Sequence, residues 1–506
     1  MRILRAFLTV SGLTLASRVL GLARDVLSAA VFGAGVVYDG FLLAFTVPNL
    51  FRRFFGEGAL SSSLVPVYAG LWREESRRRG FVAALLGRLL LLLGAIAAAG
   101  SVGAWLAAPL VGPLKWRLAL QFLAPMFPYM LLVCAVAVFG ALLNVHGRFF
   151  APAAAPVVLN LFWIAAVATL GLWARLERVR LAETLAAVVV AAGCAQLLLV
   201  LVSARRVGVP QVVSLRADPA VSRVRRLMAP MLLGVSVFQL NVLADRLIVV
   251  GFVRKAGGVT ALFYADRLVQ FPLALVGIAT ATALFPALAR AAKGGDSSGF
   301  RRRLRDGVRG VLLLAAPAAV GLAMLSSGVV RLLFERGRFD ALATRRTSGA
   351  LLFYCVGLPA FCLVHVLARA HYARERTRAP VRAAVWAMAL NLALNLLLVR
   401  HLAEAGVALA TSVTSTLNFL MLWVALGKEE RRAVRGGLAA LVAVAPASAA
   451  LAGLLWLLGR FLSGPLYVLL AIPVGAAVYF GLLVLMRLPE ARRLIRATLG
   501  RLRASS

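Results

Sequence analysis

Long apolar runs occupy most of the chain of 506 residues, and they constrain its fold more than any other feature. A membrane-spanning helix needs about 20 consecutive, mostly apolar residues. Such runs lie near residues 8–33, 36–66, 81–110, 118–143, 152–173, 181–203, 225–253, 257–289, 308–333, 347–371, 383–399, 404–427, 436–459 and 463–486. The pattern therefore predicts an all-α polytopic membrane protein with about 14 transmembrane helices. It excludes a disordered protein, a soluble enzyme with a single anchor, and a porin-type barrel, whose strands have a weak period of two.

The charge of the chain is strongly basic, with 56 Lys and Arg against 19 Asp and Glu and a formal net charge of +37. Because 62% of the residues are hydrophobic, most of these charges lie between the apolar runs. When successive segments are assigned to alternate sides, the side of the N-terminus receives more than twice as many cations as the other. The positive-inside rule then predicts that both termini lie in the cytoplasm. Nucleic-acid binding does not account for this charge, because it is divided among many short loops.

Two weak internal similarities predict a repeat. LVPVYA at Leu64–Ala69 resembles LFPALA at Leu284–Ala289, and the Pro-to-Asn spacing from Pro128 to Asn160 recurs from Pro359 to Asn391. Two matches at nearly equal offsets indicate two pseudo-symmetric six-helix lobes that enter the membrane from the same side. Transporters built in this way bind their substrate at the interface between the lobes. The predicted organisation is an N-lobe at 1–215, a C-lobe at 216–430, and two further helices with a basic cytoplasmic tail at 431–506.

Several arginines fall inside the predicted spans. A charge at the bilayer centre costs roughly 2.5–3.5 kcal/mol on insertion scales, so such residues usually face a wet cavity. Arg18 and Arg24 lie in the first span, Arg52 in the second and Arg267 in the eighth. Guanidinium groups match phosphate oxygens with paired donors and stay charged in poorly hydrated sites, so these arginines predict a site for a diphosphate. The polar residues expected along the same cavity are Asp25, Asp39, Asn49, Glu57, Ser61, Ser62 and Asp266.

The second predicted span has a weakened helix, because Pro48 removes a backbone hydrogen bond from it and Gly56 and Gly58 have low helix propensity. Interrupted helices are tolerated in membranes where their backbone lines a cavity. A structural alternative for the charges stays open at this point. In that alternative Arg18 pairs with Asp25 and Asp266 pairs with Arg267, and the pairs fix helix packing.

Four stretches carry a family resemblance. They read ASRVLGLARDVLSAAVFGAG at 16–35, YDGFLLAF at 38–45, PNLFRRFFGEGALSSSLVPVY at 48–68 and YADRLVQFP at 264–272. In these residues the chain resembles the lipid II flippase family (MurJ/MviN) of the MOP exporter superfamily. The resemblance implies a bacterial inner-membrane protein that moves undecaprenyl-diphosphate-linked peptidoglycan precursor from the cytoplasmic to the periplasmic leaflet by alternating access. One departure is Gln270, which stands where some relatives have an acid.

The resemblance also implies roles for single residues. The four arginines line the cavity and contact the diphosphate, Asp39 acts in gating or charge balance, and Glu57, Ser61 and Ser62 belong to the lining. The last two helices form a groove for the lipid tail. The implied partners are lipid II (undecaprenyl-diphosphate-MurNAc-pentapeptide-GlcNAc), membrane lipids and the cell-wall synthesis machinery, and we expect a monomer.

A second, fainter group of oxygen-bearing residues predicts a cation site. Asn391 and Asn395 are one helical turn apart, Thr411 lies in the following span, and Asp245 lies in the seventh. Hard cations prefer oxygen ligands, so this group is a candidate site for Na⁺ as a coupling or structural ion. The alternative is a set of interhelical amide hydrogen bonds. No other cofactor is expected.

Other functions are weighed by their chemistry. No Walker A, HExxH or GxSxG motif is present, so we expect no enzyme, and energy would come from the membrane potential or an ion gradient. The alternatives are an exporter of another polyprenyl-diphosphate oligosaccharide, a MOP-type drug exporter, a membrane glycosyltransferase, and a scaffold for wall synthesis. A drug exporter would favour acids and aromatics over arginines, and a glycosyltransferase would need an acidic metal site.

Overall fold

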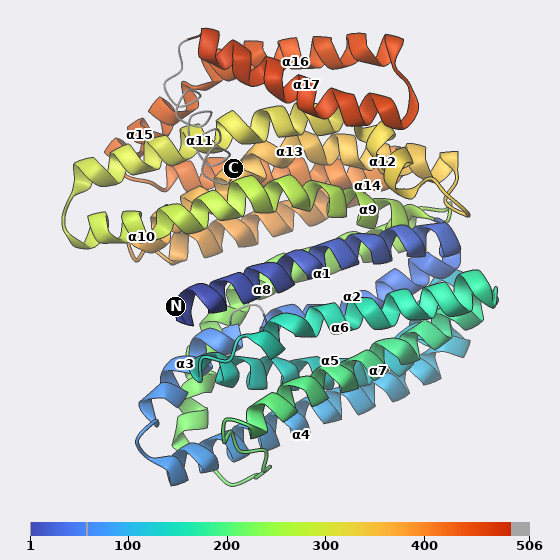
Figure 1. Cartoon of the computed structure of the whole chain (residues 1–506), viewed down its shortest axis with the longest axis vertical. Helices are drawn as coiled ribbons and strands as arrows, with labels where there is room; N and C mark the ends of the chain where they lie inside the picture. The colour runs from blue at the N-terminus through green and yellow to red at the C-terminus, as the bar shows by residue number, and fades with distance from the viewer. Residues whose placement is uncertain (1, 57–58, 487–506) are drawn as a thin grey trace. The chain divides into compact units, whose positions relative to one another are not determined.

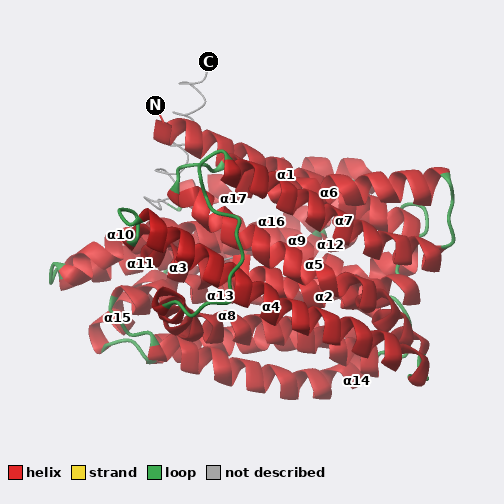
Figure 2. Ribbon diagram, turned by 90° about the horizontal axis from the view of Figure 1, so that it is seen from below, coloured by secondary structure: helices red, strands yellow, loops and turns green. Residues whose placement is uncertain are grey.

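The computed structural model describes residues 2–56 and 59–486, and this part of the chain is almost entirely α-helical, with no strand in it (Figure 2). Alanine and leucine fill the apolar runs, and both are strong helix formers. In a membrane a helix also satisfies every backbone hydrogen bond within its own segment. The predicted all-α class is therefore confirmed. Glu57, one of the predicted lining residues, lies outside the described residues.

The helices divide between two compact units. Unit 1 contains residues Met1–Val250, Arg254–Thr260 and Arg336–Asp340, and unit 2 contains Gly251–Val253, Ala261–Glu335 and Ala341–Ser506. Figure 1 labels the helices along the chain. The helices of unit 1 are α1 (Arg2–Phe32), α2 (Val36–Gly56), α3 (Ala59–Gly70), α4 (Glu75–Ala107), α5 (Leu114–Val145), α6 (Phe150–Ala166), α7 (Arg178–Arg205) and most of α8 (Pro219–Phe252). A short π-helical segment, Val167–Trp173, continues α6.

Unit 2 holds the rest of the helices. They are α9 (Gly258–Pro272, whose first turn belongs to unit 1), α10 (Ala279–Lys293), α11 (Ser297–Met324), α12 (Ser326–Phe334), α13 (Ala341–Ala373), α14 (Arg378–Val424), α15 (Lys428–Leu438), α16 (Leu441–Phe461) and α17 (Gly464–Leu485). The last two lie side by side (Figure 1) and share a core with α11, in which the buried Tyr479 donates a hydrogen bond to the carbonyl of Leu313 at 3.1 Å.

Each of the predicted apolar segments falls on helix, with instructive differences. The 36–66 segment corresponds to two helices, α2 and α3, and α2 continues through Pro48 to Gly56. The 383–399 and 404–427 segments both lie on α14, which is kinked at Ala403, where φ is 51° and ψ is −136°. Ten of the helical segments described are long and apolar enough to span a membrane. The count of about 14 spans stays a prediction, as do the lobe limits at residues 215 and 430.

Candidate functional site

Arg24 is a predicted site residue with well-defined contacts to a carboxylate and to an aromatic ring. It lies on α1 and is buried, and its Nε and Nη2 atoms donate to Oδ1 of Asp25 at 3.0 and 2.7 Å. Its guanidinium carbon lies 4.7 Å from the ring centroid of Trp163 on α6. A cation over an indole face is attracted by the ring quadrupole, and the attraction grows as water is excluded. The guanidinium is therefore oriented by one carboxylate and one aromatic face.

Trp163 is a residue of this site that the sequence analysis missed. Its indole Nε1 donates to Ser28 Oγ of α1 at 3.0 Å, and its ring meets Phe41 and Phe45 of α2 edge-on, with centroids 5.3 and 5.2 Å away. Buried tryptophan usually finds a partner for its N–H, and edge-to-face pairs add to the energy of burial. Trp163 thus joins α1, α2 and α6 behind Arg24. Its only signal in the sequence was a polar aromatic residue within an apolar run.

Arg52 is held within its own helix. Its Nε donates to Oδ1 of Asn49 at 2.8 Å, one turn earlier on α2, and both residues are half-buried. The spacing of three residues is what brings the two side chains together on one helix face. Tyr129 of α5, which is fully buried, interacts electrostatically with both Arg52 and Arg24. Tyr129 is thus within electrostatic range of two of the predicted arginines, and it is another residue that the sequence analysis did not select.

Asp39 has a different role from the arginines. It is buried at the start of α2, and its carboxylate accepts hydrogen bonds from the backbone N–H of Gly257 at 2.6 Å and of Thr260 at 2.9 Å, and from Thr260 Oγ1 at 2.7 Å. Gly257 directly precedes α9, and the first N–H groups of a helix have no partner within it. Asp39 therefore caps the N-terminus of α9 from another helix, an arrangement favoured by the helix dipole.

Two glycines allow two loops that are distant in the chain to lie close to the connection between α1 and α2. Gly257 has φ +91°, and a Cβ atom there would lie 2.6 Å from the carbonyl oxygen of Ala34. Gly337 has φ +58°, and a Cβ atom there would lie 2.4 Å from the carbonyl oxygen of Ala30. The backbone N–H of Arg338 donates to that same carbonyl at 2.8 Å. Residues 254–260 and 336–340 are thus fastened to the α1–α2 connection, with no space for a side chain.

The remaining described residues of the predicted anion site lie on three helices, α1, α3 and α9. Arg18 is exposed on α1 and makes no ion pair within residues 2–56 and 59–486, so Asp25 pairs with its neighbour Arg24 instead. In unit 2, Asp266 accepts a hydrogen bond from Gln270 Nε2 at 2.5 Å, one turn along α9 from it. Arg267 also lies on α9, and Ser61 and Ser62 lie on α3. The grouping of all four arginines stays a prediction.

The predicted cation site is divided between the units. Asp245 is buried on α8 in unit 1, while Asn391, Asn395 and Thr411 lie on α14 in unit 2. Asn391 Nδ2 donates to Oγ1 of Thr411 at 3.3 Å, and Asn395 Nδ2 donates to Oδ1 of Asn391 at 2.7 Å. Hydrogen bonds of this kind between the two halves of α14 are what the structural alternative expects. Among the described residues no cluster of three or more His, Cys, Asp or Glu is arranged for a metal.

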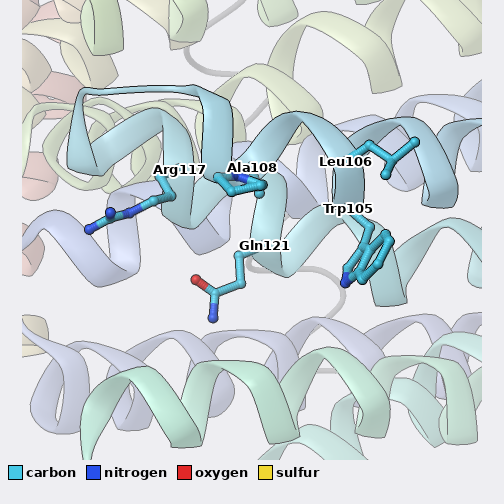
Figure 3. Close-up of a pocket in the computed structure, with 6 residues that line it drawn as sticks. Trp105, Leu106, Ala108, Arg117 and Gln121 are labelled. Carbon is cyan, nitrogen blue, oxygen red and sulfur yellow. The ribbon is translucent and has the colours of Figure 1, made fainter.

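A pocket at the joint between α4 and α5 is separate from these residues. Its lining includes Trp105, Leu106, Arg117 and Gln121 (Figure 3). Gln121 is engaged by a hydrogen bond to Glu183 of α7. With one cation and a largely apolar lining, the pocket lacks the charge that a diphosphate requires, and none of the predicted site residues that the structure describes belongs to it.

Comparison with known proteins assigns the chain to a family. The family model for lipid II flippase MurJ matches residues 28–475. A probable lipid II flippase MurJ of Rhizobium tropici is 37% identical over 440 residues, which are 84% of this chain and 81% of the relative. The lipid II flippase MurJ of Burkholderia cenocepacia is 34% identical over 441 residues, which are 85% of this chain and 84% of the relative.

Solved structures agree in fold. A lipid II flippase MurJ in an inward closed conformation matches with a TM-score of 0.80 and 24% identity, covering 96% of this chain and 99% of that one. An inward-facing multidrug resistance MATE transporter of the MOP superfamily matches with a TM-score of 0.63 and 13% identity, covering 83% of this chain and 95% of that one. With the family model over most of its length and relatives above one-third identity, the chain belongs to the lipid II flippase MurJ family.

Proposed function

We propose that this protein moves lipid II across the bacterial inner membrane, from the cytoplasmic to the periplasmic leaflet, by alternating access. The observation that carries the proposal is the buried Arg24, oriented by Asp25 and by the face of Trp163. A buried cation held in one orientation is costly for packing alone, since a buried ion pair is often no more stabilising than apolar residues of the same size. It is useful where a ligand brings several negative charges into a poorly hydrated site.

The diphosphate of lipid II has the chemistry that such a site requires. Guanidinium presents a planar set of donors that match two phosphate oxygens at once, and it keeps its charge at every relevant pH. Because Asp25 offsets the charge of Arg24, further cations are needed for a diphosphate. We assign this task to Arg52, held by Asn49, and to Arg18 and Arg267. Asp266, hydrogen-bonded to Gln270, balances the charge of Arg267.

We assign Asp39 to gating. Its three hydrogen bonds join α2 to the first turn of α9, and they lie beside the glycine contacts of the same loop. A capping contact between two helices can be made or lost as a unit, so it suits an element with two discrete arrangements. In this proposal the cap closes one end of the pathway while the diphosphate binds from the other.

The rest of the transport model follows from the family and the charge pattern. Both termini lie in the cytoplasm, the protein acts as a monomer, and α16 and α17 accompany the prenyl tail. The protein catalyses no covalent step. Translocation draws on the membrane potential or on a Na⁺ gradient, and one charge crossing the membrane is worth about 2.3 kcal/mol per 100 mV.

An accessibility assay for lipid II tests the proposal. Cells or proteoliposomes carrying wild type, Arg24→Ala or Arg24→Lys are compared for lipid II exposed in the outer leaflet. The matched control is Arg77→Ala, because Arg77 also bonds to a nearby carboxylate, Glu74, but lies on the surface. We expect transport to fall at least tenfold in Arg24→Ala and to be only partly restored by lysine, which lacks the paired donors. Wild-type transport by Arg24→Ala protein present at normal levels would refute the assignment.

A further inference from the structure

The short helix α15 carries a row of cations on one face. Lys428, Arg431, Arg432 and Arg435 are spaced by three, one and three residues, so their side chains form one stripe along two turns of helix. Nothing in the transport proposal uses these residues. They lie in unit 2, in the segment that connects α14 to α16 (Figure 1).

The opposite face of α15 is fixed to the protein. Glu430 is buried, accepts a hydrogen bond from the backbone N–H of Gly427 at 3.0 Å, and pairs at 3.0 Å with Arg374, which directly follows α13. Val434 is also buried, and a Cβ atom at Gly437 would come within 2.8 Å of Val308 on α11. The helix is therefore docked through one side, and the cationic stripe is held on the other side.

The stripe forms a pocket together with the end of α14. Trp423 and Val424 complete the lining made by the four cations, and the pocket has a volume of about 370 Å³. The indole Nε1 of Trp423 donates to the carbonyl of Arg431 at 3.2 Å, which holds the ring beside the stripe. Among the residues that the structure describes, the lining contains no carboxylate. The only ion pair that these cations make within the described part of the chain is the exposed Arg432–Glu429 contact, and exposed pairs of this kind contribute little.

The position of the pocket indicates what the cations face. α14 is long and apolar enough to span a membrane, and so is the segment Lys428–Phe461, which begins with the charged helix α15 and continues with α16. Because α15 carries the charges and lies at the end of that segment, we place it near the membrane surface. Tryptophan is enriched at that level of a membrane. From the pocket an exposed apolar row continues along α14 through Val424, Leu420 and Val413, at spacings of four and seven residues. Cations at one end and an exposed apolar row at the other match the headgroup and the acyl chains of a lipid.

We propose that this pocket binds an anionic phospholipid, with the phosphate among Arg431, Arg435 and Lys428 and the acyl chains along the exposed row of α14. Basic pockets at membrane-facing helices are known to hold anionic headgroups. The apolar row and the interfacial tryptophan select a membrane lipid over a free phosphate or a nucleic acid, which would use only the cations. The site is independent of the proposed transport of lipid II.

Tryptophan quenching in the purified full-length protein tests this inference without lipid II. The protein in zwitterionic detergent is titrated with phosphatidylglycerol that carries brominated acyl chains, and the Trp423→Phe variant identifies the signal of Trp423. We expect saturable quenching of that signal. Each cation near an anionic headgroup contributes roughly a fivefold factor, so Arg431→Gln/Arg435→Gln should weaken the apparent affinity about 25-fold.

Three comparisons make the outcome decisive. The control Arg225→Gln/Arg226→Gln changes the charge equally on the exposed part of α8 and should bind like wild type. Brominated phosphatidylcholine should quench the Trp423 signal weakly, and neither glycerol phosphate nor a single-stranded oligonucleotide should displace phosphatidylglycerol. Equal quenching by phosphatidylcholine, displacement by either competitor, or unchanged binding in the double variant would overturn the proposal. If Arg431→Gln/Arg435→Gln does not fold, Lys428→Gln/Arg432→Gln is measured against the same criteria.

Discussion

The cap that Asp39 places on α9 leads to a quantitative prediction. Asp39→Ala removes the acceptor of two backbone N–H groups and one hydroxyl, all in a buried place. A buried donor left without its partner costs about 1–3 kcal/mol. Two backbone donors lose their acceptor, and that acceptor is charged. We therefore expect the capped arrangement to lose roughly 3–5 kcal/mol. A loss of that size raises the open population by about two to four orders of magnitude.

Hydrogen exchange measures this loss directly. In wild type the amides of Gly257 and Thr260 should exchange slowly, and in Asp39→Ala their protection should fall by about a hundredfold or more. Asp39→Asn should give an intermediate result, because the amide keeps one acceptor oxygen but directs an NH₂ group at a donor. The control is Asp306→Asn, the same change at an exposed aspartate that pairs with Arg305. If the two amides remain as protected in Asp39→Ala as in wild type, the cap does not hold this end of α9. If protection falls and lipid II transport is unchanged, the cap is structural and the gating role is wrong.

Three further predictions concern helices α13, α14 and the end of α5. Glu404→Gln breaks a buried ion pair in which Arg346 donates through Nε at 2.6 Å and Nη2 at 2.9 Å, so the free energy of unfolding should fall by about 3–5 kcal/mol, measured by thermal unfolding in detergent. Ala403→Gly relieves a positive φ in a non-glycine residue and should raise stability by up to about 1 kcal/mol in the same assay. Burial, followed by a nearby arginine, lowers the pKa of His146. Folded His146 therefore binds a proton less well than His146 in the unfolded chain. The stability from the Tyr68–His146 contact is present above the ordinary histidine pKa near 6.5, and it is lost as the pH falls through the lowered pKa of the folded state. His146→Gln should flatten that part of the stability profile, and an unchanged profile would refute the assignment.

The length of the apolar runs predicted the helices well, because a run of that length has few other ways to satisfy its backbone in a membrane. The same pattern did not reveal the kink at Ala403, since periodicity does not report the φ of a single alanine. It also indicated a helix weakened by Pro48, Gly56 and Gly58, and α2 continues through Pro48 to Gly56. Helices with proline persist in membranes when neighbouring groups satisfy the freed carbonyl, and those neighbours come from packing that hydropathy does not encode.

For the site, residue type was more informative than spacing. Arginines and acids inside apolar runs drew attention to Arg24 and Asp39, which are buried, and to Arg52, which is half-buried, because burying a charge demands a partner. The partners themselves were harder to predict. Asp39 binds backbone N–H groups more than two hundred residues away in the chain, and backbone donors leave no signal in a side-chain pattern.

The pairing of Asp25 illustrates how packing decides between equal candidates. A spacing of seven residues places Arg18 on the same helix face as Asp25, whereas the neighbouring Arg24 projects to an adjacent face. The structure nevertheless pairs Asp25 with Arg24, and Trp163 adds a second contact: its ring centroid lies 4.7 Å from the guanidinium carbon, while Nε and Nη2 donate to the carboxylate. Arg18 stays exposed on α1. The two arginines are therefore not equivalent, and if they meet the same diphosphate, Arg24 does so as a fixed and partly neutralised group, whereas Arg18 can reorient without losing an ion pair to Asp25.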